Sequence, residues 1–252
     1  MLLNNKVAVI TGGASGIGRA TALKYTNEGA KVVVADYNEE GANETVELIR
    51  SFGGEAVTYK VDVSKFGEVK ALVDFAVDTY KTIDIMFNNA GISRANLINE
   101  LNEELYHQTL GVNQHGVAYG IAAASNKMIG LGVKGVIINT ASVYGIMASR
   151  GFFPYHVSKG AVVMMTKSAA LDLAPYGIRV IGVAPGFVST PLIKGIREVE
   201  QHKNYHMRKE FITPEEIADT VCILAMKEAN VVNGSVVMLD DGLTSFKGHL
   251  SK

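Results

Sequence analysis

Two residues that could act together as an acid and a base lie in the segment "FFPYHVSKGA" (152–161), where Tyr155 stands four positions before Lys159. On a helix, this spacing places both side chains on one face. An ammonium group beside a phenol favours the phenolate, which can take the proton of an alcohol. The spacing alone is not specific, because Tyr205 also stands four positions before Lys209.

Alcohol oxidation is the chemistry that such a pair would serve. A free tyrosine has a pKa about three units too high for a base at neutral pH, which corresponds to about 4 kcal/mol. One ammonium group about 4 Å away, at an effective dielectric near 20, supplies about that amount. Ser142 follows an apolar run upstream of Tyr155 and could hydrogen-bond the substrate oxygen. We therefore predict Tyr155 as the acid/base, and Tyr205, which has no such companions, as a solvated helix or lid residue.

A glycine-rich loop, "TGGASGIG" (11–18), follows the first apolar run and precedes a helical pattern. Gly12, Gly16 and Gly18 would let the backbone N–H groups and the positive end of the helix approach a pyrophosphate. The second apolar run ends at Asp36, whose carboxylate can accept hydrogen bonds from an adenosine ribose. No Lys-Ser or Lys-Thr pair follows the loop, which argues against a nucleoside-triphosphate site.

Seven short apolar runs must position these residues. Continuous apolar runs are typical of strands buried on both faces, and the stretches between them have helical patterns. The alternation predicts an α/β fold, a doubly wound parallel sheet with helices on both faces, in a single domain over 1–252. The predicted strands are 6–10, 31–35, 56–61, 83–87, 135–140, 178–184 and 235–239.

Two helix starts can be read from capping residues. Ser64 is a candidate N-cap for a helix over 64–80. The stronger signal is "TPEE" (213–216), where Thr213 would be the N-cap, Pro214 the first helical residue, and Glu216 the partner in a capping box.

Composition excludes several functions. The net charge of −1 and the absence of a basic tract give no support for nucleic-acid or membrane partners. The N-terminal apolar run is too short for a signal peptide or a membrane span, so we expect a cytoplasmic protein. Cys222 is interpreted as a buried hydrophobe. His202 and His206 have a spacing that could bind metal, but without an evident third ligand we predict a solvated helix face and no metal site.

The glycine loop resembles the T-G-x-x-x-G-x-G loop of the short-chain dehydrogenase/reductase family in its compact form, and further motifs extend the resemblance over nearly the whole chain. They are "VDV" (61–63), "NNAG" (88–91), "VN" (112–113), "INTASVYG" (138–145), "YHVSK" (155–159) and "PGFVSTP" (185–191). The resemblance implies a Rossmann fold with a nicotinamide dinucleotide. The implied cofactor contacts are Gly12, Ser15, Gly16, Ile17, Gly18, Asp36, Tyr37, Asp62, Val63, Asn89, Ala90, Gly91, Tyr155, Lys159, Pro185, Gly186, Val188 and Thr190.

The resemblance also implies a catalytic set, Asn113, Ser142, Tyr155 and Lys159. In that set, Asn113 would hold a water that links Lys159 to solvent. The implied substrate is a small-molecule alcohol or ketone, and the implied assembly is a homotetramer. The substrate pocket would be lined by 93–95, 143–153 and 187–210, within a substrate loop at about 187–212. It would offer Arg94, Arg150, Phe152, Phe153 and Phe187.

Asp36 and its neighbour Tyr37 favour NAD over NADP. Family members that prefer NADP usually have an arginine at one of these positions or in the glycine loop, where this chain has Ser15. Arg19 follows the loop, and we expect its helix to point it away. A carboxylate repels a 2′-phosphate about 5 Å away by roughly 3 kcal/mol at an effective dielectric near 20, or about a hundredfold in selectivity.

Two alternatives remain open from the sequence. A non-catalytic dinucleotide sensor would keep the fold, but it has no use for the serine, tyrosine and lysine. A methyltransferase also uses a glycine loop and an acidic strand end, but not the tyrosine–lysine pair. The chain departs from the usual family pattern at Asp241, where a glycine is common, at Tyr106, where a tryptophan is frequent, and in a somewhat long tail over 244–252.

Overall fold

The computed structural model describes residues 1–193 and 199–245, and its centre is a seven-stranded parallel sheet with the strand order β3-β2-β1-β4-β5-β6-β7. The strands are β1 (Val7–Thr11), β2 (Lys31–Asp36), β3 (Glu55–Lys60), β4 (Ile85–Asn88), β5 (Val136–Thr140), β6 (Arg179–Pro185) and β7 (Val236–Leu239). Each of the seven predicted runs contains one of these strands, apart from shifts of one or two residues at the ends. The predicted doubly wound α/β fold is confirmed.

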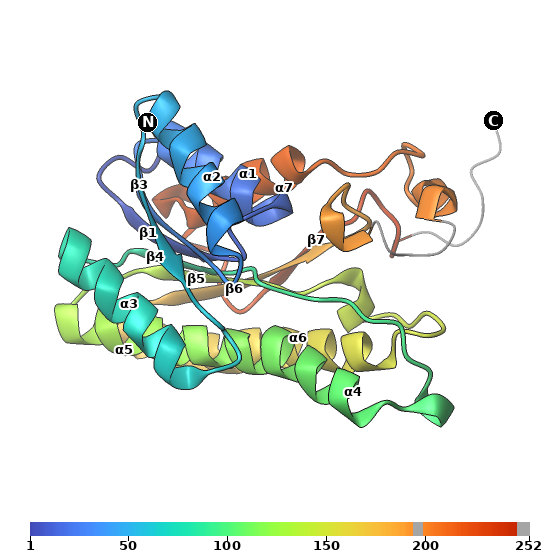
Figure 1. Cartoon of the computed structure of the whole chain (residues 1–252). Coiled ribbons are helices and arrows are strands. Elements are labelled where there is room, and N and C mark those ends of the chain that lie inside the picture. Colours follow the sequence, from blue (N-terminus) through green and yellow to red (C-terminus); the bar gives the residue numbers. More distant parts are fainter. Residues whose placement is uncertain (194–198, 246–252) are drawn as a thin grey trace.

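Helices cover both faces of the sheet (Figure 1). They are α1 (Gly16–Asn27), α2 (Glu39–Ser51), α3 (Phe66–Tyr80), α4 (Glu103–Leu110), α5 (Gly116–Leu131), α6 (Phe153–Leu173) and α7 (Pro214–Ala225). The helices α1, α2 and α7 form one layer, and α3, α4, α5 and α6 lie on the other side (Figure 1).

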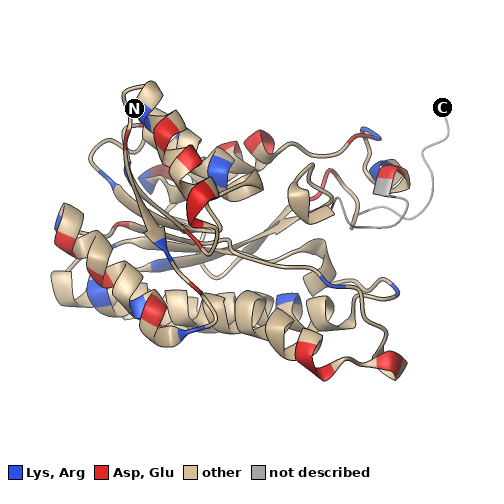
Figure 2. Ribbon diagram, viewed as in Figure 1, with Lys and Arg blue, Asp and Glu red and all other residues tan. Residues whose placement is uncertain are grey.

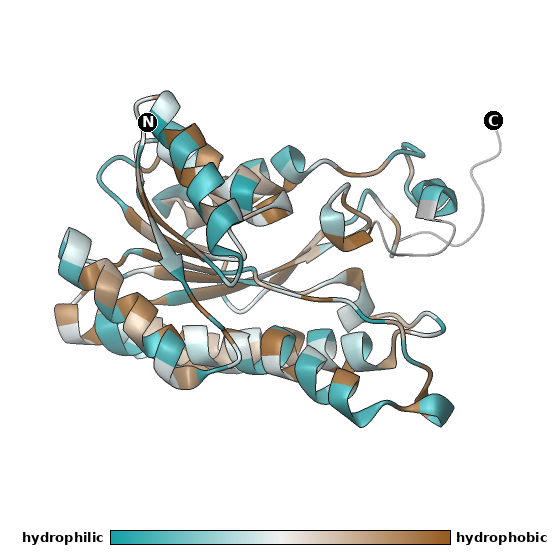
Figure 3. Ribbon diagram, in the orientation of Figure 1, coloured by the Kyte–Doolittle hydropathy of each residue, from teal (hydrophilic) through white to brown (hydrophobic). Residues whose placement is uncertain are grey.

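Alternate residues of each strand enter two separate hydrophobic cores. In β1, Ala8 and Ile10 pack in the core beneath α1, α2 and α7, whereas Val9 packs in the core beneath α3, α5 and α6. All three side chains are fully buried. Hydrophobic colouring accordingly concentrates in the strands, while charged residues lie mainly on the outer helices and the loops (Figures 2 and 3). None of the described helices is long and apolar enough to cross a membrane.

The two predicted helix starts have different outcomes. At α7 the capping box is confirmed: Thr213 Oγ1 accepts from Glu216 N–H at 3.2 Å, and Glu216 Oε2 accepts from Thr213 N–H at 2.8 Å. The prediction for Ser64 is wrong, because α3 begins at Phe66 after an N-cap at Lys65. The Ser64 hydroxyl instead donates to Asp62 Oδ1 at 2.6 Å.

Candidate active site

A cavity of about 1080 Å³ lies at the carboxyl ends of the strands, where β1 pairs with β2 on one side and with β4 on the other. The chain order reverses at this point of the sheet, and open α/β sheets bind their ligands there. Every residue predicted for catalysis or cofactor contact, except Gly18 and Asn113, lines the cavity. Residues that are far apart in the chain are therefore brought into one site.

The glycine loop forms the floor at one end of the cavity. Gly12 and Gly16 have positive φ angles of +69° and +52°, which favour glycine. A Cβ on Gly18 would lie 2.0 Å from the Gly12 carbonyl oxygen, so Gly18 allows α1 to pack against the loop rather than lining the cavity. Asn89 Nδ2 donates to the Thr11 and Gly12 carbonyl oxygens at 3.1 and 3.3 Å, which fixes the loop from the side of β4.

Asp36 lies at the same end, and its carboxylate is held by the backbone. Oδ2 accepts from Ala14 N–H at 3.0 Å, and Oδ1 accepts from Asn38 N–H at 2.8 Å. Arg19 does not line the cavity. Its guanidinium donates to Thr45 Oγ1 and Glu44 on α2, each at 2.9 Å. The positive charge nearest the glycine loop in sequence is thus already paired away from the cavity.

The serine, tyrosine and lysine meet at the other end. Ser142 follows β5 as the N-cap of a 3₁₀ turn, Val143–Gly145, and Tyr155 and Lys159 lie on the first turns of α6. All three are buried, with exposed fractions of 7, 9 and 2%. Lys159 Nζ donates to the Thr140 carbonyl oxygen at 2.7 Å and lies 5.6 Å from the centre of the Tyr155 ring. The predicted shared helix face is confirmed.

The pKa values of Tyr155 and Lys159 are both shifted by burial. Burial raises the pKa of Tyr155 to about 12, although its hydrogen bond with Ser142 acts in the opposite direction. Burial also lowers the pKa of Lys159 to about 8. The expected lowering of the Tyr155 pKa is not found, because desolvation of the buried phenol is the largest influence on it.

Helix α6 is held against the sheet by a fully buried chain of hydrogen bonds. Asn88 Nδ2 donates to Asn139 Oδ1 at 2.9 Å, and Asn139 Nδ2 donates to Thr166 Oγ1 at 3.1 Å. The Thr166 hydroxyl in turn donates to the Val162 carbonyl oxygen at 2.9 Å. This chain connects β4, β5 and α6, so it fixes the helix that carries Tyr155 and Lys159 relative to both strands.

Asn113 lies in a π-helical turn, Gly111–His115, between α4 and α5. Its Oδ1 accepts from Ile92 N–H at 2.8 Å, and its Nδ2 donates to the Ile92 carbonyl oxygen at 2.9 Å and to Ser158 Oγ at 3.2 Å. The side chain is fully buried and does not line the cavity. It clamps the segment after β4 to α6. Single π turns of this kind are frequent at functional sites.

The end of the cavity that holds Tyr155 has an aromatic wall, which we define as Tyr144, Phe152 and Phe187. The Tyr144 ring centre lies 5.6 Å from that of Phe152, 6.0 Å from that of Phe187, and 6.3 Å from that of Tyr155. Tyr144 was predicted only as part of the range 143–153, although its place two residues after Ser142 could have indicated it.

Three predicted pocket residues do not line the cavity, namely Arg94, Arg150 and Phe153. Both arginines are exposed. Phe153 begins α6 and stacks on Tyr106, with ring centres 6.3 Å apart, because the helix turns it away from the cavity. Part of the predicted substrate loop, 194–198, and the end of the tail, 246–252, lie outside the described residues.

The second tyrosine–lysine pair does not share a helix face. Tyr205 ends a 3₁₀ helix, Val199–Tyr205, and is 60% exposed, whereas Lys209 lies beyond it with a φ of 57°. The solvated face predicted for His206 is wrong, because only 2% of this residue is exposed. Both of its ring nitrogens contact backbone groups, of Phe187 and Glu210. Such tertiary partners are not visible in a local pattern.

Comparisons with known proteins agree with this geometry. The sequence model of a family described as "Enoyl-(Acyl carrier protein) reductase" matches residues 12–244. A cyclohexanol dehydrogenase of Acinetobacter is 39% identical over 96% of this chain and 96% of its own length. A 3-oxoacyl-[acyl-carrier-protein] reductase of Thermotoga maritima is 36% identical over 96% of this chain and 99% of its own. A short-chain type dehydrogenase/reductase from Mycobacterium marinum has a crystal structure that matches with a TM-score of 0.94 and 31% identity, covering 97% of both chains.

The chain belongs to the short-chain dehydrogenase/reductase family. It is accordingly an oxidoreductase that uses a nicotinamide dinucleotide.

Proposed function

We propose that this protein is an NAD-dependent dehydrogenase/reductase that interconverts a secondary alcohol and a ketone, with Tyr155 as the general acid/base. The observation that supports this most is the joint burial of Ser142, Tyr155 and Lys159 at one end of a cavity whose other end holds the Asp36 carboxylate. A dinucleotide sensor would gain nothing from burying a lysine, because desolvation of its charge costs stability.

The residues of the cavity fit the cofactor. The glycine loop presents backbone N–H groups where side chains would block a pyrophosphate, and Asp36 presents a carboxylate suited to ribose hydroxyls. Asp62 and Val63 would border the adenine, while Pro185, Gly186, Val188 and Thr190 would border the nicotinamide. When bound, this cofactor supplies the hydride acceptor or donor of the reaction.

The protein's own side chains would manage the proton. In ketone reduction, the Tyr155 hydroxyl donates its proton to the substrate oxygen, and a phenol with a raised pKa is in the right state for this step. In alcohol oxidation, the Tyr155 phenolate takes the hydroxyl proton. Ser142 orients the substrate oxygen by a hydrogen bond, and Lys159 favours the phenolate whenever its ammonium is charged.

Asn113 is proposed to complete the proton path. Both hydrogens of its side-chain amide are used by Ile92 and Ser158, but Oδ1 accepts only one hydrogen bond, from Ile92, and keeps a second acceptor site. A Cβ on Gly91 would lie 3.5 Å from Asn113 Oδ1 and 3.7 Å from Lys159 Nζ, so the two side chains border the same small space. A water there could connect Lys159 to solvent.

The wider setting is also a proposal. We propose that residues 1–252 form one domain, with 187–212 as the substrate loop, and that it works in the cytoplasm as a homotetramer. Met164 and Leu171 on α6 are 60% and 77% exposed, which favours their burial between subunits. Sedimentation would measure the assembly, and a monomeric particle at micromolar concentration would contradict it.

A panel of secondary alcohols and ketones, assayed for NADH formation or consumption, tests the proposed reaction. Cyclic and linear alcohols, steroids and an acyl thioester should be included, each with both NAD and NADP. We expect NAD-linked turnover of at least one secondary alcohol or its ketone. Tight NADH binding without turnover of any member would instead favour the sensor.

A further inference from the structure

A buried histidine lies behind the aromatic wall. His206 is 2% exposed, and its ring centre lies 6.0 Å from that of Phe187. A Cβ on Gly186 would lie 2.7 Å from His206 Nε2 and 3.2 Å from Asp240 Cα. The imidazole therefore lies directly against the backbone that leads into the wall, and glycine at position 186 leaves room for it. His206 itself does not line the cavity.

The two hydrogen bonds of His206 define its protonation. Nε2 accepts from the Phe187 N–H at 3.1 Å, and Nδ1 lies 2.6 Å from the Glu210 carbonyl oxygen. An amide N–H can only donate and a carbonyl oxygen can only accept. The ring must therefore be neutral, with its hydrogen on Nδ1 and its lone pair on Nε2. A charged ring would lose the bond to Phe187.

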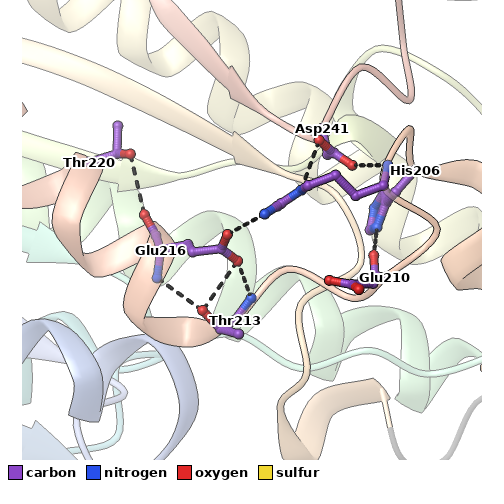
Figure 4. A network of polar contacts seen from close by, with 7 residues as sticks. His206, Glu210, Thr213, Glu216, Thr220 and Asp241 are labelled. Carbon is purple, nitrogen blue, oxygen red and sulfur yellow. Dashed lines mark hydrogen bonds and ion pairs between the residues drawn. The ribbon is translucent and has the colours of Figure 1, made fainter.

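The segment that carries His206 is held by an ion-pair cluster of Arg208, Asp241 and Glu216, which we call the Arg208 clasp. Its two carboxylate residues, Asp241 and Glu216, are labelled in Figure 4. Arg208 N–H donates to Asp241 Oδ2 at 2.8 Å, and its Nε donates to Asp241 Oδ1 at 3.1 Å. Arg208 Nη1 contacts Glu216 Oε1 at 2.6 Å. Because Asp241 follows β7 and Glu216 caps α7, the clasp ties the segment to two fixed elements.

We propose that His206 is a positioning residue for substrate binding, an inference that rests on the proposed function. Its neutral imidazole holds the Phe187 backbone, which sets the Phe187 ring edge-on to Tyr144 in the aromatic wall. The Arg208 clasp keeps the imidazole in place. The contact path therefore runs from the end of β7, through His206, to the wall that faces Tyr155.

Two variants separate the hydrogen bond from simple space filling. His206→Phe keeps an aromatic ring but leaves the buried Phe187 N–H without an acceptor. His206→Gln keeps an amide oxygen that can accept near the Nε2 position. Loss of one such bond corresponds to about tenfold. We expect His206→Phe to raise KM for the alcohol by about that factor, with kcat and the Kd for NADH within about twofold, and His206→Gln to recover most of the loss.

The opposite pattern contradicts the proposal. Equal rises in KM for the two variants would show that an acceptor at position 206 is not what holds the wall, and a wild-type KM in His206→Phe would show that only ring shape matters there. A rise in the NADH Kd as large as the rise in KM would place the effect in cofactor binding. Thermal unfolding of each variant verifies that folded protein is compared.

A third measurement needs neither variant activity nor a known substrate. Long-range proton–nitrogen correlation spectra of the wild-type protein report the state of each imidazole, and the His206 signals are assigned by their loss in His206→Gln. We expect a neutral ring protonated on Nδ1 at pH 7. A charged ring, or a proton on Nε2, would overturn the positioning role. If the wild type oxidises no alcohol, the proposed function fails on the assay while this spectrum still decides the state of His206.

Discussion

The two ends of the cavity differ in whether backbone or side chains form their surface. The dinucleotide end is mostly backbone: Gly12 and Gly16 shape the loop, and Asp36 is held by main-chain N–H groups. The substrate end is mostly side chains, with Tyr144 and Phe187 carried by segments that follow β5 and β6. A backbone-built site can serve one cofactor in many proteins, whereas a side-chain-built wall can change with a few substitutions.

The two ends of the cavity also differ in how their charged side chains are stabilised. The Asp36 carboxylate accepts hydrogen bonds from two backbone N–H groups, and such bonds stabilise a carboxylate. Lys159 is buried beside a single carbonyl acceptor, and its lowered pKa reflects the cost of its charge. The substrate end thus gives up stability for chemistry, as active sites commonly do.

The strongest test of this contrast is Tyr155→Phe, which keeps the ring and removes the titrating hydroxyl. We expect kcat to fall by about a thousandfold, within the range for general acid–base groups, and the NADH Kd to stay within about twofold. Steady-state rates and NADH fluorescence titration measure the two effects. Tyr205→Phe is the matched control and should retain most activity. Comparable losses in the two variants would mean that the acid/base is assigned wrongly.

At the other end, Asp36→Ala should change cofactor choice rather than chemistry. The wild type should prefer NAD over NADP by about a hundredfold in kcat/KM, because the carboxylate repels a 2′-phosphate. The variant should lose most of that preference through a lower KM for NADP, with kcat nearly unchanged. A wild-type enzyme that prefers NADPH would refute this and would implicate Arg19, despite its contacts with α2.

Lys159→Met should have a pH-dependent effect on stability. In the wild type, folding lowers the pKa of Lys159 from 10.5 to about 8, so the unfolded chain binds more protons between these pH values. Lys159 should therefore contribute a stability that rises with pH in this window, by as much as about 3 kcal/mol, so the wild type should gain stability relative to the variant between these pH values. Denaturant unfolding at pH 7.5 and pH 10 measures the difference.

The control for this substitution is Lys167→Met on the exposed face of the same helix. It should follow the wild type at both pH values. If the stability of Lys159→Met changes with pH as that of the wild type does, then Lys159 is not the group responsible. In activity assays, Lys159→Met should raise the apparent pKa that controls alcohol oxidation, because the phenolate loses its nearest cation.

The smallest expected effect concerns Asp241 in the Arg208 clasp. Asp241 has a φ of 46°, a conformation that glycine adopts without strain. Asp241→Gly relieves that strain but removes the carboxylate from the Arg208 clasp, and an exposed ion pair contributes little. We expect Tm to change by less than about 3 °C while KM for the alcohol rises severalfold. A wild-type KM would show that the clasp does not support the wall.

Patterns of neighbouring residues in the sequence correctly predicted the strands and the helix face that carries Tyr155 and Lys159. Continuous apolar runs identified the seven strands, because strands buried on both faces need them, and the four-residue spacing identified the shared face of Tyr155 and Lys159. The errors came from contacts between distant segments. His206 was placed in solvent because its partners, Phe187 and Glu210, follow from a folded loop. The prediction that Arg94 and Arg150 line the pocket was wrong for the same reason.

The predicted lowering of the Tyr155 pKa was wrong for a related reason. The sequence showed the nearby lysine but not the depth of burial, and burial determined the direction of the shift. A pairwise estimate of charge effects is therefore incomplete until the exposed fractions are known.

The hydrogen-bond chain from Asn88 through Asn139 to Thr166 has a consequence for how this sequence can diverge. Each member supplies a partner for its neighbour inside a fully buried layer. An apolar replacement of one member leaves a donor or an acceptor of the next unpaired, which costs more than replacing neighbouring members together. Among proteins that share this layer, the three positions should therefore change in concert, and the route from one workable combination to another passes through poorly folding intermediates.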